Sequence, residues 1–495
     1  MAAKELTISV AMTAEVDGVL RSHLIREDGQ EDVCLATYSV STGDRRETIL
    51  VTSVELPRDG ERAVHGNASF TGGYVLRVAS EAARRGQGIV VLHSHPRGSG
   101  WQGLSYEDHD SEQSFKRLAQ TMTGLPLLGM TLAGSDSSWS ARQWSDGSAP
   151  VWAESVRVVG DTLRLSWNEQ VCRAPVSTGS QVRTVSAWGP KIQADVARLR
   201  VLVVGVGSVG LDVAQRLVAT GIVHVGVMDF DSVEEINLDR MIGATLRDAR
   251  LHRAKVEVAA RLMRAAATAE TPDIAIHDVS ICDPGGLAIA LDYDVIFSCV
   301  DRPWPRAVLN AIAYADLIPV IDGGISIETF SEGGMRGASW RAQTLVPGLP
   351  CMACSGQLRM GDVALDQQGL LDDPEYIRRA GRATGPRNQN VAALSASVSA
   401  AQLAQFVSLV AAPGGRAVPG PLRYVLAPHH LEHVDCATQE FCPSERATGA
   451  GDGRPALTRR EGPWNVVLAT RRRNARSLRA RGARIADRFT AAIIR

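Results

Sequence analysis

The feature that most constrains the fold is an apolar segment that is interrupted by a glycine-rich turn. Residues 199–231 read LRVLVVGVGSVGLDVAQRLVATGIVHVGVMDFD, in which a β-branched run meets Gly205, Gly207 and Gly210 and a helical pattern follows. A second strand-like run ends the segment, so the pattern predicts a strand, a helix and a parallel strand. Two later apolar runs, DYDVIFSCVD and LIPVIDGGIS, are typical of further buried parallel strands. We therefore expect an α/β fold with a Rossmann-like, largely parallel sheet in the second half of the chain.

The 495 residues are too many for one hydrophobic core, so we expect several domains. Changes in the residue pattern along the chain indicate where they begin and end. Strand-like and helix-like runs predict a compact α/β domain over residues 1–147, which ends near the polar stretch SDSSWSARQWSDGSAP. The weakly patterned residues 148–185 are expected to connect it to the parallel-sheet domain, which covers residues 186–450 and contains a Cys-rich insert. Residues 451–495 are expected to form a flexible basic tail, as a solvated helix in preference to a binding surface for an acidic partner.

Composition limits the class of protein. Hydrophobic residues make up 45% of the chain and charged residues 22%, which is a globular composition. The net charge of -1 gives no overall attraction to nucleic acid or to membrane surfaces. The first residues lack a basic stretch followed by a long apolar run, and no segment has the ~18 uninterrupted apolar residues that a membrane span needs. We therefore expect a cytoplasmic protein without a membrane or nucleic-acid partner, whose clustered cysteines bind metal or react.

Residues 93–108, HSHPRGSGWQGLSYED, carry a candidate metal site. In an extended strand, His93 and His95 project to the same side and can face one ion. A catalytic zinc takes three protein ligands and keeps an open position, and Asp108 at the start of the next helix is the natural third ligand. Ser105 can cap that helix and hydrogen-bond a developing oxyanion. A general base is also needed, and Glu31 before an early strand is our candidate.

These residues resemble the motif of the JAMM (JAB) metalloprotease family, which consists of an upstream Glu, a His-x-His-Pro and a Ser-x-x-Asp. The resemblance covers about residues 1–145 and implies zinc-dependent cleavage after the terminal glycine of a ubiquitin-like protein. Nine residues separate His95 from Ser105, which is a longer loop than is usual in the family. Alternatives remain for the base and for the third ligand: Asp32, Glu47 and Glu55 for the former, and His109 and Asp110 for the latter.

The glycine turn predicts a phosphate site, because backbone amides at a helix N-terminus can approach a phosphate there. Asp229 at the end of the next strand can hold ribose hydroxyls, which fits NAD as well as ATP. The residues that follow favour ATP, since an enzyme that attacks its α-phosphate must neutralise a polyphosphate. The candidates for this site, besides the three glycines and Asp229, are Asp231, Asn237, Arg240, Lys255 and, as a magnesium ligand, Asp301.

This pattern resembles the adenylation domain of the ThiF/MoeB and ubiquitin-activating enzymes over roughly residues 183–330. The family pattern is a glycine turn, an Asp-x-Asp strand end, Asn-Leu-x-Arg, a Lys and a later Asp. The chain departs from it at Ser208, where the family often has Gly, and at Met241, where it often has Gln. The resemblance implies ATP and magnesium as cofactors and a homodimer in which Arg183 reaches into the partner's ATP site.

Two pairs of cysteines follow the parallel-sheet segment. Cys351 and Cys354 form a Cys-x-x-Cys, and Cys436 and Cys442 lie further along, so four thiolates could hold a structural zinc. One thiolate could be replaced by a histidine, for which the candidates are His429, His430 and His433. Alternatively, Cys351 is a thioester nucleophile of the kind that ubiquitin-activating enzymes use.

Together the two halves predict a bifunctional enzyme. The chain resembles bacterial fusions of a JAB domain with a ubiquitin-activating-like domain, which occur beside ubiquitin-like and conjugating-enzyme-like proteins and are linked to phage defence. The resemblance implies that the first half trims or removes a small ubiquitin-like protein, and that the second half adenylates the C-terminus of that protein. Two alternatives stay open: activation of a sulfur carrier in cofactor biosynthesis, and an inactive first half that only binds the ubiquitin-like protein. A hydride-transfer enzyme that uses NAD is a distant third.

Overall fold

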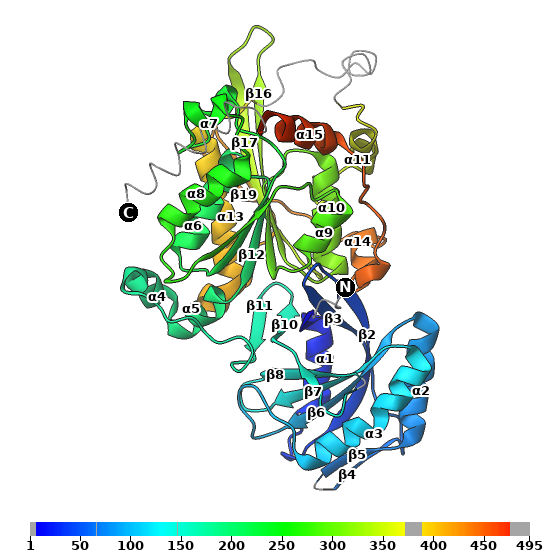
Figure 1. The fold of residues 1–495 in the computed structure, drawn as a ribbon. Coiled ribbons are helices and arrows are strands. Elements are labelled where there is room, and N and C mark those ends of the chain that lie inside the picture. Colours follow the sequence, from blue (N-terminus) through cyan, green and yellow to red (C-terminus); the bar gives the residue numbers. More distant parts are fainter. Residues whose placement is uncertain (1–5, 66, 146, 372–388, 476–495) are drawn as a thin grey trace.

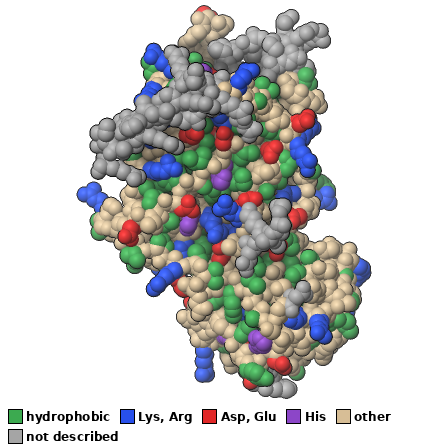
Figure 2. Space-filling view, viewed as in Figure 1, with side chains coloured by type: hydrophobic (Ala, Val, Ile, Leu, Met, Phe, Trp, Pro, Cys, Tyr) green, Lys and Arg blue, Asp and Glu red, His purple; other side chains and the backbone are tan. Residues whose placement is uncertain are grey.

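The structure is a computed structural model that describes residues 6–65, 67–145, 147–371 and 389–475. Two large sheets organise the chain, one in each half, and the first half lies beneath the second in Figure 1. Charged side chains of both signs are intermixed with apolar ones over the face shown in Figure 2, which agrees with the near-zero net charge.

The first sheet has nine strands in the order β11-β10-β1-β3-β2-β6-β7-β8-β9 and is mixed. Helix α1 (Ala14–Leu24), helix α2 (Gly72–Arg85) and helix α3 (Tyr106–Thr123) pack on it, and β4 (Arg62–His65) pairs with β5 (Asn67–Phe70) apart from it. The strands are β1 (Thr7–Thr13), β2 (Val33–Thr42), β3 (Arg46–Glu55), β6 (Gly88–His95), β7 (Leu127–Ala133), β8 (Trp139–Trp144), β9 (Val151–Trp152), β10 (Ser155–Val159) and β11 (Leu163–Trp167).

Residues 148–185, which we expected to be a connection, contain strands of this first sheet. β10 pairs in parallel with β1, and β11 pairs with β10. These strands have only five residues each, and β10 is buried along its whole length. The sequence of β10 therefore lacks the alternation of apolar and polar residues that marks a half-buried strand.

The second sheet has eight strands in the order β14-β13-β12-β15-β16-β17-β18-β19. Pairing is parallel from β14 through β16 and antiparallel from β16 on, so the predicted parallel sheet is present with an antiparallel extension. The strands are β12 (Arg200–Val204), β13 (His224–Met228), β14 (Asp273–His277), β15 (Val295–Ser298), β16 (Val320–Thr329), β17 (Met335–Leu345), β18 (Leu422–Val425) and β19 (His430–His433).

Helices cover both faces of the second sheet. By length and composition, α13 (Ala392–Ala411) is the one helix among the described residues that could cross a membrane. It packs on α6, β16 and β17 with Leu394, Val398 and Phe406 buried. The other helices are α4 (Val182–Trp188), α5 (Pro190–Ala197), α6 (Ser208–Ala219), α7 (Leu246–Arg250), α8 (Lys255–Ala266), α9 (Pro284–Ala290), α10 (Pro303–Ala315), α11 (Met360–Gln367), α14 (Pro443–Arg446) and α15 (Pro463–Ala475).

The C-terminal segment differs from the expected flexible tail. Trp464 in α15 is only 3% exposed, and Leu457 packs against the same apolar cluster of the second sheet. These apolar side chains are separated by arginines. The basic composition of the segment therefore gave no indication that part of it packs on the hydrophobic core. Residues 476–495 of the predicted tail lie outside the described residues.

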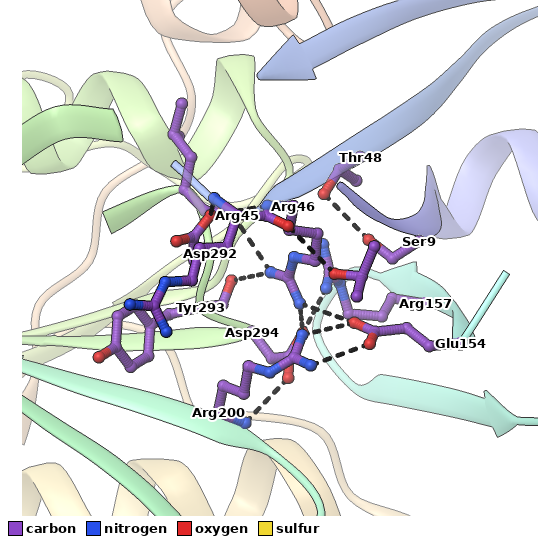
Figure 3. Close-up of polar contacts among 12 residues, drawn as sticks. Ser9, Arg45, Arg46, Thr48, Glu154, Arg157, Arg200, Asp292, Tyr293 and Asp294 are labelled. Atoms are coloured by element: carbon purple, nitrogen blue, oxygen red, sulfur yellow. Dashed lines mark hydrogen bonds and ion pairs between the residues drawn. The ribbon is translucent and has the colours of Figure 1, made fainter. Parts of the chain in front are cut away.

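The two halves share one core and a buried charge network. Trp167 of β11 belongs to the same hydrophobic cluster as Val201 of β12. Beside it, the Asp294 carboxylate accepts hydrogen bonds from Arg46 of β3, at 2.6 Å, and from Arg157 of β10 (Figure 3). The other Asp294 oxygen accepts from the backbone N of Arg200 in β12 at 2.9 Å.

Glu154 completes this network. Its two carboxylate oxygens accept from the Arg200 guanidinium at 2.5 and 2.9 Å, and one of them lies 3.5 Å from Arg46 Nη1 (Figure 3). Burial alone would raise the pKa of Asp294, but the charges of Arg46 and Arg157 outweigh it and hold that pKa well below the ordinary value. Asp294 is therefore the ionised centre of a buried contact between the halves.

Asp294→Asn should lower the free energy of unfolding by roughly 3–5 kcal/mol, because it leaves buried arginines without their carboxylate. Glu328→Gln, which breaks the exposed ion pair with Arg336, is the matched control and should cost less than about 1 kcal/mol. Urea unfolding at pH 7 measures both values, and equal losses would contradict the assignment.

The pH dependence of the same variant has a defined sign. Because folding depresses the pKa of Asp294, its contribution is complete above the unfolded aspartate pKa of about 3.9 and is lost as pH falls through the lower folded value. The difference in stability between wild type and Asp294→Asn should therefore stay constant from pH 8 to about pH 5 and shrink below about pH 4. A difference that instead grows on acidification would show that the carboxylate is not ionised in the folded protein.

Candidate functional site

The histidine pair and Asp108 meet at the end of β6. His93 Nε2 and His95 Nε2 are 3.2 Å apart, and the Asp108 carboxylate oxygens lie 3.5 and 3.6 Å from them. All three ligand atoms lie within 4.8 Å of one another, an arrangement that could hold a metal ion. The nitrogen and carboxylate donors are those that catalytic zinc prefers, so the residues present fit this ion.

The start of α3 holds Asp108 in place. Ser105 is the N-cap: its hydroxyl accepts from Asp108 N at 3.0 Å, and Asp108 Oδ2 accepts from Ser105 N at 3.1 Å. This capping box fixes the carboxylate and keeps Ser105 within the site. The sequence placed both residues at a helix start, and the structure has them there.

Gln102 is a residue of this site that the sequence reading missed. Its side-chain oxygen lies 3.1 Å from His95 Nδ1, and its amide nitrogen donates to the carbonyls of Ser99 and Gly100. His95 Nδ1 therefore donates to Gln102, which leaves the Nε2 lone pair directed at the site. The nine-residue loop between His95 and Ser105 is the feature of the sequence that indicates an additional residue here.

Electrostatics at this site follow from the contacts. Burial alone would raise the pKa of Asp108, but hydrogen bonds from His93 and His95 lower it far below its usual range. The hydrogen bond to Asp108 is the largest cause of the raised pKa of His95, and the charge of Glu31 contributes. The Asp108 carboxylate thus stays anionic beside the two imidazoles, an arrangement that a cation can occupy.

Glu31 lies beside the histidines. Val33 of β2 is opposite His93 of β6, so the residue that precedes β2 by two lies along the end of β6. Within the part of the chain that the structure describes, the Glu31 carboxylate has no hydrogen-bond or ion-pair partner, which leaves it available as a base.

The rival residues are engaged elsewhere. The competing bases pair with other groups: Asp32 with Arg62 and Arg26, Glu55 with Arg77 and Arg85, and Glu47 with Gln143. The rival ligands lie outside the cluster: His109 packs on the Trp144 ring, and Asp110 is exposed.

The glycine turn lies at the carboxyl end of β12. Gly205 has φ +86°, and a Cβ there would be 2.6 Å from the carbonyl oxygen of Cys299. A Cβ on Gly210 would clash with the carbonyl of Gly205, so α6 can approach the turn only without side chains at these positions. Gly207 is the N-cap of α6, whose first amides are free of a side-chain cap. These features are those of a helix start that can accept an anion.

Asp229 ties the turn to the end of β13. Its carboxylate accepts from Val206 N at 2.7 Å and from Asp231 N at 2.8 Å, and burial raises its pKa. Lys255 Nζ donates to Asp231 at 2.8 Å. Burial alone would lower the pKa of Lys255, but the charges of Asp229, Asp231 and Asp301 raise it, so the lysine stays cationic among three carboxylates.

Arg240 and Asn237, which were also predicted for the nucleotide site, have hydrogen-bond partners in their own loop. Arg240 donates to the carbonyl of Ile236 at 2.6 Å and to Asp239 at 2.8 Å, and Asn237 caps the same short turn, accepting from Glu234 N. Arg240 Nη1 and the Asn237 side-chain oxygen are therefore hydrogen-bonded within their own loop, which sequence spacing could not reveal. Arg183 in α4 is exposed, and Asp301 follows β15 with its side chain exposed.

Three of the four predicted cysteines form a second cluster. Cys351 Sγ lies 3.6 Å from Cys354 Sγ and 3.5 Å from Cys442 Sγ, and Cys351 is fully buried. Cys436 is outside this group, as are the three candidate histidines. Burial raises the pKa of Cys351 to about 11, which does not favour an attacking thiolate. A soft-ligand set of three thiolates fits a zinc ion that takes one more donor.

A parallel sheet with a glycine turn at its carboxyl edge defines the class of Rossmann-like α/β proteins. The model of the ThiF family matches residues 178–431, just over half of the chain, and the chain belongs to this family.

Individual relatives match the same region. The molybdopterin-synthase adenylyltransferase of Escherichia coli (strain K12) is 34% identical over 144 residues, which are 27% of this chain and 55% of that protein. The SAMP-activating enzyme E1 of Haloferax volcanii is 30% identical over 168 residues, which are 34% of this chain and 56% of that protein. The chain thus spans about half the length of these relatives. A crystal structure of E. coli MccB with ATP has 16% identity and a TM-score of 0.42, over 54% of this chain and 74% of that one.

Zinc content tests both clusters. His95→Ala should lose one equivalent of bound zinc, because it removes one of three ligands, and Cys442→Ser should lose a different equivalent. His224→Ala is the control, since His224 lies in an exposed pair with Asp273. Mass spectrometry of metal content after dialysis gives the counts, and a wild-type protein that retains no zinc would rule out both sites.

Proposed function

We propose that the second half of the chain adenylates the C-terminus of a small ubiquitin-like or sulfur-carrier protein. In this reaction a terminal carboxylate attacks the α-phosphate of ATP, an acyl-phosphate bond forms, and pyrophosphate leaves with the cleaved bond's electron pair. Membership of the ThiF family supports the proposal, as do the names of the adenylyltransferases and activating enzymes that the chain resembles.

The observation that carries this proposal is the Asp229 carboxylate on the glycine turn with Lys255 beside it. The turn can receive phosphates, Asp229 can bind ribose hydroxyls, and Lys255 can neutralise the charge that develops on leaving pyrophosphate. Asp301 is the candidate magnesium ligand, since its exposed carboxylate lies close enough to raise the pKa of Lys255. Arg240 Nη1 is hydrogen-bonded within its own loop, whereas Lys255 lies beside Asp229 and Asp231, so we assign charge neutralisation chiefly to Lys255.

We further propose that the first half hydrolyses the bond after the terminal glycine of the same class of protein. A zinc ion held by His93, His95 and Asp108 would supply Lewis-acid polarisation and an acidified water. The Glu31 carboxylate would take the water's proton and deliver it to the leaving amine. Ser105, whose hydroxyl accepts from Asp108 N, keeps its proton available for a developing oxyanion.

One substrate class unites the two proposals, because a peptidase that exposes a terminal glycine produces the carboxylate that an adenylating enzyme consumes. In this account the enzyme acts in the cytoplasm of a bacterium, as a homodimer, and passes its product to a conjugating-enzyme-like protein in an antiviral pathway.

The buried position of Cys351 favours a structural role for the thiol cluster over a thioester on that residue. The second candidate function is sulfur-carrier activation in cofactor biosynthesis, in which the acyl-adenylate passes to sulfide and not to an amine acceptor; the relatives' names favour it equally.

Two variants separate the activities. Glu31→Gln should slow cleavage of a ubiquitin-like protein extended beyond glycine by about 10²- to 10⁴-fold, the usual loss for a proton-transfer residue, and leave ATP–pyrophosphate exchange unchanged. Lys255→Met should slow exchange by about 10²- to 10³-fold and leave cleavage unchanged.

Glu27→Gln and Lys191→Met, at exposed positions, are the matched controls. Cleavage is followed by mass spectrometry and exchange with labelled pyrophosphate. Retained cleavage by Glu31→Gln would exclude Glu31 as the base, and absence of cleavage by wild type would reduce the first half to a binding module. Retained exchange by Lys255→Met would remove the assigned nucleotide site.

A further inference from the structure

The C-terminal helix α15 packs against the strand end that bears Asp229. Trp464 lies between Phe230, at 6.3 Å between ring centroids, and Trp304, at 5.3 Å. Phe230 is the residue between Asp229 and Asp231, and Leu468 packs in the same apolar cluster. Figure 1 shows α15 beside α10 and α11. The helix therefore belongs to the surroundings of the candidate nucleotide site, although it follows Asp229 by more than 200 residues in the sequence.

Arg471 of this helix reaches the main chain of the site. Its Nη1 donates to the carbonyl oxygens of Phe230 at 3.1 Å and Asp231 at 3.2 Å, and its Nη2 donates to the Asp278 carboxylate. The side chain is only 12% exposed. Asp278 directly follows β14, so one guanidinium links the carboxyl ends of two neighbouring strands.

These acceptors are part of the machinery already described. The Asp231 carbonyl that accepts from Arg471 also accepts from Lys255 N at 3.0 Å. The amide of Asp231 donates to the Asp229 carboxylate, and Asp229 N donates to the carbonyl of His277 beside Asp278. Arg471 thus contacts the loop on which Asp229, Asp231 and Lys255 depend for their relative positions.

We infer that Arg471 is a positioning residue of the nucleotide site, an inference that rests on the proposed function. By bridging Phe230, Asp231 and Asp278, it holds the β13 end in the form that presents Asp229 to ribose and Lys255 to the polyphosphate. The planar guanidinium suits this task, since it offers several donors in a fixed geometry and a lysine offers a single point charge. The C-terminal helix thereby becomes a component of ATP binding.

Binding of magnesium-ATP to the full-length protein tests the inference. By isothermal titration, Arg471→Met should weaken binding about tenfold, which is about 1.4 kcal/mol. Arg471→Lys should restore part of that loss through its charge, and Arg473→Met, at an exposed position on the same helix, should bind as wild type does.

Two further measurements separate positioning from packing. In ATP–pyrophosphate exchange, Arg471→Met should raise KM for ATP about tenfold and change kcat less than about threefold, because the reacting groups themselves remain. Trp464→Ala, which removes packing, should lower the midpoint of thermal unfolding, whereas Arg471→Met should leave that midpoint nearly unchanged.

The outcomes are distinguishable. If wild type binds ATP and Arg471→Met binds it equally well, the inference fails and the proposed function stands. If Arg473→Met weakens binding as much as Arg471→Met, the effect is one of general charge and the inference also fails. If wild-type protein binds no ATP, the proposed function fails, and the inference fails as well because it rests on that function.

Discussion

The Asp294 carboxylate is the contact on which the arrangement of the two halves depends. A buried carboxylate is costly unless it is paired, and here Arg46 and Arg157 come from the first sheet while the Arg200 amide comes from the second. The cluster that joins Trp167 to Val201 excludes water next to this network. Separating the halves would expose apolar surface and leave the arginines without their carboxylate partner. The two halves, each with its candidate site, are therefore held together.

Both sites are built by the same structural device, a strand that ends where a helix begins. β6 ends at His95 and α3 brings Asp108 to it, while β12 ends before Gly205 and α6 begins at Ser208. Strand ends place side chains and backbone amides at fixed points, and helix starts offer free amides or a capped carboxylate. In the second half, neighbouring parallel strands add Asp229 and Asp301 at the same edge, which is where ligands bind in open α/β sheets.

The sequence predicted those features that depend on local periodicity and spacing. The alternation of His93 and His95, the Ser105 capping position and the glycine turn each follow from the geometry of one strand, one helix start or one βαβ unit. It failed where long-range packing decides. Nothing local indicates that β10 joins β1, that Gln102 turns back to His95, or that Trp464 is buried in an Arg-rich segment. Arg240 keeps the family spacing, and its Nη1 donates to the carbonyl of Ile236 in its own loop, a contact that spacing does not specify.

The central claim is that one glycine-ended tail is the product of the first site and the substrate of the second. It is tested most directly by ATP–pyrophosphate exchange with two forms of a ubiquitin-like protein, one ending in glycine and one extended past it. The account predicts that wild type exchanges with both forms and that Glu31→Gln exchanges only with the form ending in glycine. Exchange of Glu31→Gln with the extended form at the wild-type rate, or absence of wild-type exchange with either form, would contradict it.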